Sequence, residues 1–190
     1  MYGTTFDFRI ARSLFAAVGA LFLAAPGRVS AHDPGLSALT LRLTNSTLIA
    51  TLTLARADAE ALVTLDANRD GRLTTEEFAK ARPELELAGA DALEVRLAGA
   101  NIEPASVIVS LGHGDEINLE IAFLLTPGKP FTIRSVLLAQ MPRGHRQYAV
   151  LRDGRNNLLA EKLLDVKQAV LETSGRSHVQ VKERGRTLLD

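Results

Sequence analysis

The sequence of 190 residues contains no cysteine. It therefore has no disulfide bond, no thiolate ligand for a metal and no cysteine that could carry a lipid anchor. An excess of one charge is also lacking, because 22 lysines and arginines balance 22 aspartates and glutamates. Without a basic excess or a long run of one sign, the sequence does not indicate a protein that binds nucleic acid or an anionic membrane surface.

Long hydrophobic runs are missing too. The longest, SLFAAVGALFLAA at residues 13–25, is much shorter than the roughly 20 residues that a membrane-spanning helix needs. Arg9 and Arg12 precede this run, and Val29-Ser30-Ala31 follows it, which is the pattern of a secretory signal peptide. We expect cleavage after Ala31, a mature chain that begins at His32, and export to a periplasm or out of the cell. An uncleaved membrane anchor is the alternative interpretation.

Known catalytic motifs are absent as well. The sequence has no Gly-x-Ser-x-Gly, no phosphate-binding glycine loop and no His-Glu-x-x-His, and no spacing places a serine and an aspartate beside a histidine. We therefore predict that the protein is not an enzyme. A triad that only folding brings together is the alternative left open.

What the sequence does have is strong alternation of apolar and polar residues. Residues 38–44 and 47–54 alternate strictly and flank the turn Asn45-Ser46, which predicts a β-hairpin. Residues 146–152 and 157–164 flank Asp153-Gly154 and predict a second hairpin. Further strands are predicted at 93–97, 107–111, 117–125, 130–138 and 166–172. About eight short strands with turns every 8–12 residues predict a mainly β protein with a β-sandwich-like domain.

The period changes to a helical one directly after the first hairpin. Residues 57–65 and 75–82 carry apolar residues at helical spacing, and Pro83 is expected to stop or kink the second helix, although residues 84–92 could continue it. We therefore expect a helix–loop–helix insertion at about 57–82 within a domain at 32–173, followed by a flexible tail at 174–190.

The loop of this insertion, LDANRDGRLTTEEF at 65–78, carries oxygen-bearing side chains at alternate positions. Calcium prefers six to eight oxygen ligands, and the sharp reversal that such a loop requires falls on Gly71. Arg72 would contribute its backbone carbonyl, Thr74 would act through water, and Glu77 would bind with both carboxylate oxygens. The predicted calcium ligands are Asp66, Asn68, Asp70, Arg72, Thr74 and Glu77.

This stretch resembles an EF-hand calcium loop. The other interpretation is a capped helix start, because Thr74 and Glu77 also form the sequence pattern of a capping box. No second loop is visible to pair with it, so we expect weak binding, with a dissociation constant on the order of 10⁻⁵ to 10⁻³ M. The predicted function is that of an exported calcium-binding protein in which the ion is structural and supports binding of a partner.

Histidines suggest an alternative function. A mature N-terminal His32 would offer an amine and an imidazole to nickel or copper, and His145 or His113 could complete the site. The protein would then be a periplasmic carrier or accessory domain for a transition metal. The simpler interpretation of each histidine is a solvated loop residue.

Three segments, AHDPGLS at 31–37, LDANRDGRLT at 65–74 and PRGHRQY at 142–148, give the sequence a wider resemblance. Together they resemble the exported N-terminal region of HupE/UreJ-type membrane proteins. That family is linked to nickel handling and carries membrane helices after this region, and the present sequence contains none of them. The resemblance implies a periplasmic or membrane protein as partner, but it does not imply transport by this chain.

Overall fold

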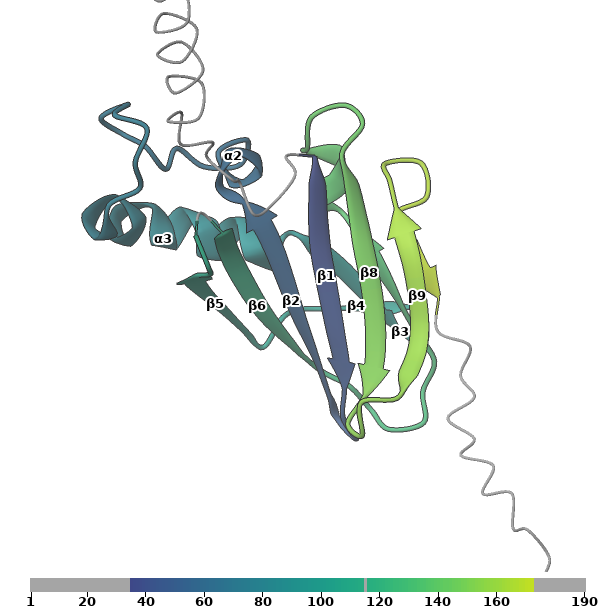
Figure 1. Ribbon diagram of the computed structural model, residues 1–190. Coiled ribbons are helices and arrows are strands. Elements are labelled where there is room, and N and C mark those ends of the chain that lie inside the picture. The colour runs from purple at the N-terminus through teal and green to yellow at the C-terminus, as the bar shows by residue number, and fades with distance from the viewer. Residues whose placement is uncertain (1–34, 115, 173–190) are drawn as a thin grey trace, which may run out of the picture. The chain divides into compact units, whose positions relative to one another are not determined.

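A computed structural model of the protein describes residues 35–114 and 116–172. The predicted signal peptide at 1–31, the predicted mature N-terminus His32 and the predicted tail at 174–190 lie outside the described residues. Within the described part the protein is mainly β, with two sheets and two α-helices (Figure 1).

The larger sheet has six strands in the order β5-β6-β2-β1-β8-β9. Their bounds are β1 Leu36–Leu43, β2 Thr47–Ala55, β5 Ser106–Leu111, β6 Glu116–Leu124, β8 Arg146–Asp153 and β9 Leu158–Leu164. Neighbours are antiparallel except for β1 and β8, which run parallel with Leu36 opposite Arg146. Both predicted hairpins, β1–β2 and β8–β9, are confirmed.

The smaller sheet has four strands in the order β10-β7-β3-β4. Their bounds are β3 Leu93–Leu97, β4 Ala100–Ile102, β7 Phe131–Ser135 and β10 Val170–Glu172. The predicted strand at 130–138 ends early, because Leu137 and Leu138 are both buried and a strand would point them to opposite faces. They lie instead in a short 3₁₀ helix, η1 Leu137–Ala139. The predicted strand at 166–172 is likewise shortened to β10, and β4 was not predicted.

One hydrophobic core is shared by the two sheets. Leu39 and Leu41 of β1, Phe123 of β6 and Ile133 of β7 belong to the same buried cluster and are at most 1% exposed. Alternate residues of these strands are buried, as the period-two pattern predicts. The coarse prediction of a mainly β domain with two sheets is therefore confirmed.

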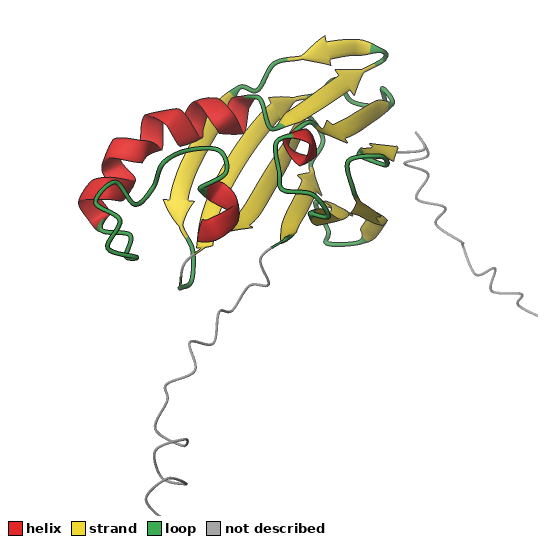
Figure 2. Cartoon of the chain, turned by 90° about the horizontal axis from the view of Figure 1, so that it is seen from above, coloured by secondary structure: helices red, strands yellow, loops and turns green. Residues whose placement is uncertain are grey.

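The first helix differs from the prediction, because α2 Arg56–Ala59 is a single turn instead of a helix over 57–65. The second helix, α3 Thr75–Ala90, continues past Pro83, which is the continuation over 84–92 that the sequence left open. The helix–loop–helix of an EF-hand is thus not confirmed on its first side. Residues beyond Pro83 pack on β5 and β6, with Leu85 and Gly89 buried, and this burial offsets the hydrogen bond that proline cannot make (Figure 2).

Helices that could cross a lipid bilayer are not found among the described residues, since neither α2 nor α3 is both long and apolar enough.

Candidate functional site

The predicted calcium loop folds back on itself through the carboxylate of Asp66. This carboxylate accepts hydrogen bonds from the backbone N–H of Asp70 at 3.1 Å and of Gly71 at 2.7 Å. Gly71 has φ +79°, which only glycine adopts without strain. The reversal expected from the sequence is therefore present at Gly71.

Asn68 and Asp70 point their side chains into the same turn. The Asn68 Oδ1 atom accepts from Asp70 N–H at 2.8 Å, Asp70 Oδ1 accepts from Arg72 N–H at 2.8 Å, and Asn68 Nδ2 donates to Asp70 Oδ2 at 3.1 Å. These bonds orient the side chains and use only part of their capacity, because a carboxylate has about four lone-pair sites. The donor set is chemically suited to calcium, which binds carboxylate, amide and carbonyl oxygens.

Glu77 closes the loop from the start of α3. Its Oε2 accepts from the Thr74 backbone N–H at 3.0 Å and hydroxyl at 2.8 Å, while its Oε1 accepts from Asn68 N–H at 3.4 Å. Its side chain is 8% exposed, and these donors, the Thr74 N–H foremost, hold the pKa of Glu77 below its ordinary value. Thr74 caps the helix in return, so the capping box is present and contains the predicted twelfth ligand.

The residues of the loop nevertheless do not form a ready cage. Among residues 35–114 and 116–172, no three histidine, aspartate or glutamate side chains are gathered as a metal-binding group. A calcium ion would have to draw Asp66, Asp70 and Glu77 together. On the other side of the loop, Arg56 of α2 donates to the Gly71 carbonyl at 3.1 Å and pairs with Glu60 at 3.2 Å.

A second polar cluster was not predicted. Ser37, Asp58, His145 and Gln147 are all buried, with exposures of 0–5%. His145 Nε2 lies 3.0 Å from Ser37 Oγ, His145 Nδ1 lies 3.5 Å from Asp58 Oδ1, and Gln147 Nε2 donates to Ser37 Oγ at 3.3 Å. We name these four residues the buried cluster.

The topology explains how the buried cluster forms. Parallel pairing places Ser37 on β1 beside Gln147 on β8, and His145 directly precedes β8. The helix α2 follows β2 at the same end of the six-stranded sheet and contributes Asp58 (Figure 1). These residues are up to 110 positions apart, so no local spacing could have revealed them.

The chain enters the described region beside this cluster. The Gly35 N–H donates to both carboxylate oxygens of Asp58 at 3.3 Å, and the Gly35 carbonyl accepts from Arg146 N–H at 2.9 Å. Gly35 is therefore held between the two elements that carry Asp58 and His145. Burial lowers the pKa of His145, and the nearby carboxylate of Asp58 opposes this shift.

The predicted histidines are not equivalent. His145 is buried, whereas His113 is exposed in the turn between β5 and β6. This turn lies at the same end of the sheet, but β6 and β8 are separated by β2 and β1, which amounts to about 14 Å at the usual strand spacing. The structure therefore does not bring His113 to His145.

Serine, histidine and aspartate stand in the order of a catalytic triad within the buried cluster. Ser37 is only 1% exposed, however, and its oxygen already accepts a hydrogen bond from Gln147. In this conformation Ser37 is closed to a substrate.

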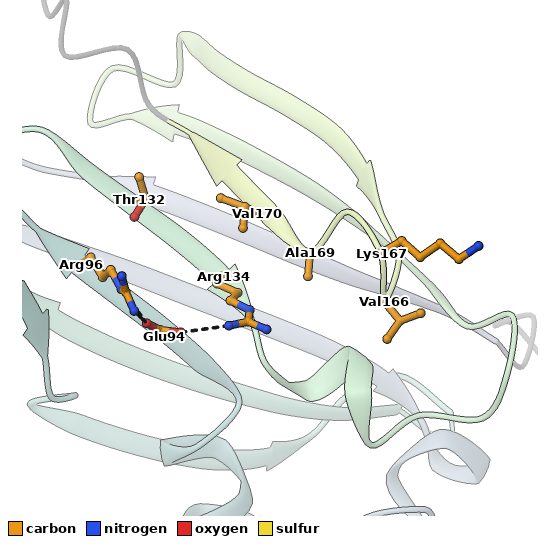
Figure 3. A pocket seen from close by; sticks show the side chains of 8 residues that line it. All are labelled: Glu94, Arg96, Thr132, Arg134, Val166, Lys167, Ala169 and Val170. Carbon is orange, nitrogen blue, oxygen red and sulfur yellow. Dashed lines mark hydrogen bonds and ion pairs between the residues drawn. The ribbon is translucent and has the colours of Figure 1, made fainter. Parts of the chain in front are cut away.

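The outer face of the smaller sheet carries a surface hollow of about 380 Å³. Glu94 pairs there with Arg96 at 2.6 Å and with Arg134 at 3.6 Å, and Thr132 and Lys167 also line it (Figure 3). Both arginine side chains are more than half exposed, so these ion pairs contribute little to stability. The hollow is positively charged and contains none of the predicted metal ligands.

No family model matches the chain, and no curated protein matches it. The resemblances to an EF-hand loop and to HupE/UreJ-type proteins therefore stay predictions.

Proposed function

We propose that the protein is an exported calcium-binding domain whose ion occupies the loop at 66–77. The predicted ligands are the side chains of Asp66, Asn68, Asp70 and Glu77, the carbonyl of Arg72 and, through water, Thr74. When bound, calcium supplies a positive charge that neutralises the three carboxylates of the loop.

The observation that carries the proposal is the position of Glu77. Its carboxylate reaches from the first turn of α3 to the N–H of Asn68, so the last predicted ligand already contacts the first half of the loop. A helix cap alone would need Thr74 and Glu77, but not the three oxygen-bearing side chains that fold into the turn before them.

We further propose that calcium is structural here. The first helix of an EF-hand is reduced to the single turn α2, and the loop is joined to it by the Arg56–Gly71 hydrogen bond. An ion that draws the loop together fastens it to α3, and this would present a fixed surface to a membrane or periplasmic protein partner.

Calcium titration calorimetry on the exported full chain tests the proposal. We expect one calcium per chain with a dissociation constant on the order of 10⁻⁵ to 10⁻³ M. The variant Glu77→Gln keeps an acceptor for the cap but loses a charge, and it should weaken binding about tenfold or more, equivalent to about 1.4 kcal/mol.

Glu76→Gln is the matched control, because Glu76 is the exposed neighbour in the same helical turn. It should bind calcium as the parent does. If both variants bound calcium equally weakly, the loss in Glu77→Gln would come from the removed negative charge alone and not from a lost ligand. If the parent bound no calcium, the calcium site would be refuted.

A further inference from the structure

The edge of the larger sheet at β5 differs from the other sheet edges in the part of the chain that the structure describes. The strands at those edges are β5 and β9 in the larger sheet and β10 and β4 in the smaller one (Figure 1). An edge strand carries unpaired backbone groups that another strand can bind. Proteins commonly protect such an edge by keeping the strand short, by placing charges on it or by covering it.

Protection of this kind is present at the other edges. The strands β4 and β10 are only three residues long. The strand β9 carries Glu161 and Lys162, and Lys162 Nζ donates to the Val170 carbonyl of β10 at 3.1 Å. By contrast, β5 has six residues, SVIVSL, without a charge or a proline and with three β-branched side chains in a row. These residues favour strand pairing, so β5 is the edge most suited to accept a further strand.

The backbone groups of alternate residues in β5 face the open edge. The Gly112 N–H donates to the Glu116 carbonyl at 2.8 Å, and β5 pairs with β6 in the same register. Even-numbered residues of β5 therefore bond to β6, and the residues between them direct their N–H and C=O groups the other way. Val107 and Val109 thus present both backbone groups to the open edge. The helix α3 packs on β5 and holds this edge in place.

The sequence of β5 matches a second copy of itself. Residues 106–110, SVIVS, read the same in both directions about Ile108. If two copies pair antiparallel about a two-fold axis at Ile108, each serine meets a serine, and Val107 meets Val109 and exchanges both N–H···O bonds with it. Ile108 then meets Ile108 of the second copy at a non-hydrogen-bonded pair, where side chains are closest. This contact would cover a side chain that is 50% exposed.

We propose that the protein forms a symmetric dimer through antiparallel pairing of β5, which joins two larger sheets into one continuous sheet. A second copy is the partner because it satisfies each open backbone group of Val107 and Val109 and brings no charge opposite a like charge. The contact is one strand wide, so its buried area is about 1,200 Å² or less, and we expect a dissociation constant on the order of 10⁻⁵ M. The dimer does not depend on calcium binding.

Sedimentation equilibrium of the protein over a range of concentrations, in EGTA, tests the dimer. We expect the mass to rise from monomer to dimer with concentration. Ile108→Lys places like charges opposite each other on the axis and should weaken dimerisation about tenfold or more. Leu163→Lys is the matched control, because Leu163 is 48% exposed on the opposite edge strand of the same sheet, and it should dimerise as the parent does. The proposal is overturned if the parent stays monomeric or if both variants dimerise equally.

A cysteine on the axis tests the register in a chain that has no other thiol. Cα atoms about 4.5 Å apart at a non-hydrogen-bonded pair lie within the range of about 4.4–6.8 Å that disulfides need. Ile108→Cys should therefore form an intermolecular disulfide on mild oxidation. Leu163→Cys should crosslink about tenfold or more slowly, because its thiols meet only by diffusion. Equal rates of crosslinking would overturn the pairing about Ile108.

Discussion

Glu77 contacts both ends of the loop that it closes, accepting from Asn68 N–H on one side and from Thr74 on the other. At the scale of single residues, the side chain of Glu77 therefore belongs both to the helix cap and to the proposed calcium site. Changes at Thr74 and Glu77 are therefore expected to affect stability even without calcium.

Replacing Thr74 by alanine removes the hydroxyl that accepts from Glu77 N–H and donates to the Glu77 carboxylate. We expect a loss of about 1 kcal/mol in the free energy of unfolding, measured by denaturant titration in EGTA. Thr75→Ala, at the next and exposed position, is the control and should change stability much less. Equal effects of the two variants would contradict the capping role.

The free energy of unfolding should depend on pH in part through the titration of Glu77. Because the pKa of Glu77 is lower in the folded protein than its ordinary value of 4.5, its contribution is complete above that value and is lost as the pH falls through the folded pKa. Denaturant midpoints measured without calcium should therefore fall less steeply below about pH 4.5 in Glu77→Gln than in the parent. Identical profiles would show that the carboxylate is not stabilised by its hydrogen bonds.

At the scale of elements, the contact of α3 with the larger sheet depends on a glycine. A Cβ atom at Gly89 would lie 2.8 Å from Val107 Cγ1, so the Val107 side chain, the helix or the strand would have to move. We expect Gly89→Ala to destabilise the protein by about 1 kcal/mol, since overpacking costs about 1–3 kcal/mol and better helix propensity returns part of it.

The control for that change is Leu87→Ala on the same helix, where the side chain is 70% exposed. It should leave the thermal unfolding midpoint nearly unchanged. If Gly89→Ala raised the midpoint, the close packing of α3 on β5 would be refuted.

The sequence predicted those elements whose periodicity decides their structure. The strictly alternating residues of β1, β2 and β6 were found with nearly correct bounds, and the loop residues were found because their spacing is local. It failed where tertiary contacts overrule local preference. Asp58 is buried against Gly35 in a helix of one turn, where the sequence predicted a helix over 57–65. The sequence left open whether the second helix continues past Pro83, and the burial of its later residues on the sheet decides that it does.

At the scale of the whole molecule, the parallel pairing of β1 with β8 is the feature that local patterns could not predict. It joins Ser37 to His145 across 108 positions and so creates the buried cluster. Through α2, the same end of the larger sheet also holds the loop at 66–77, because Arg56 donates to the Gly71 carbonyl and Asp58 belongs to the buried cluster. The buried cluster and the proposed calcium site thus depend on one correctly formed sheet end.

Thermal unfolding of the protein in EGTA and in about 1 mM calcium, with magnesium as the control ion, tests the central claim most directly. A dissociation constant ten to a hundred times below the calcium concentration predicts stabilisation by about 1–3 kcal/mol, selective for calcium. Unfolding curves that coincide in EGTA and calcium, or that shift equally with magnesium, would contradict a calcium site in the loop at 66–77.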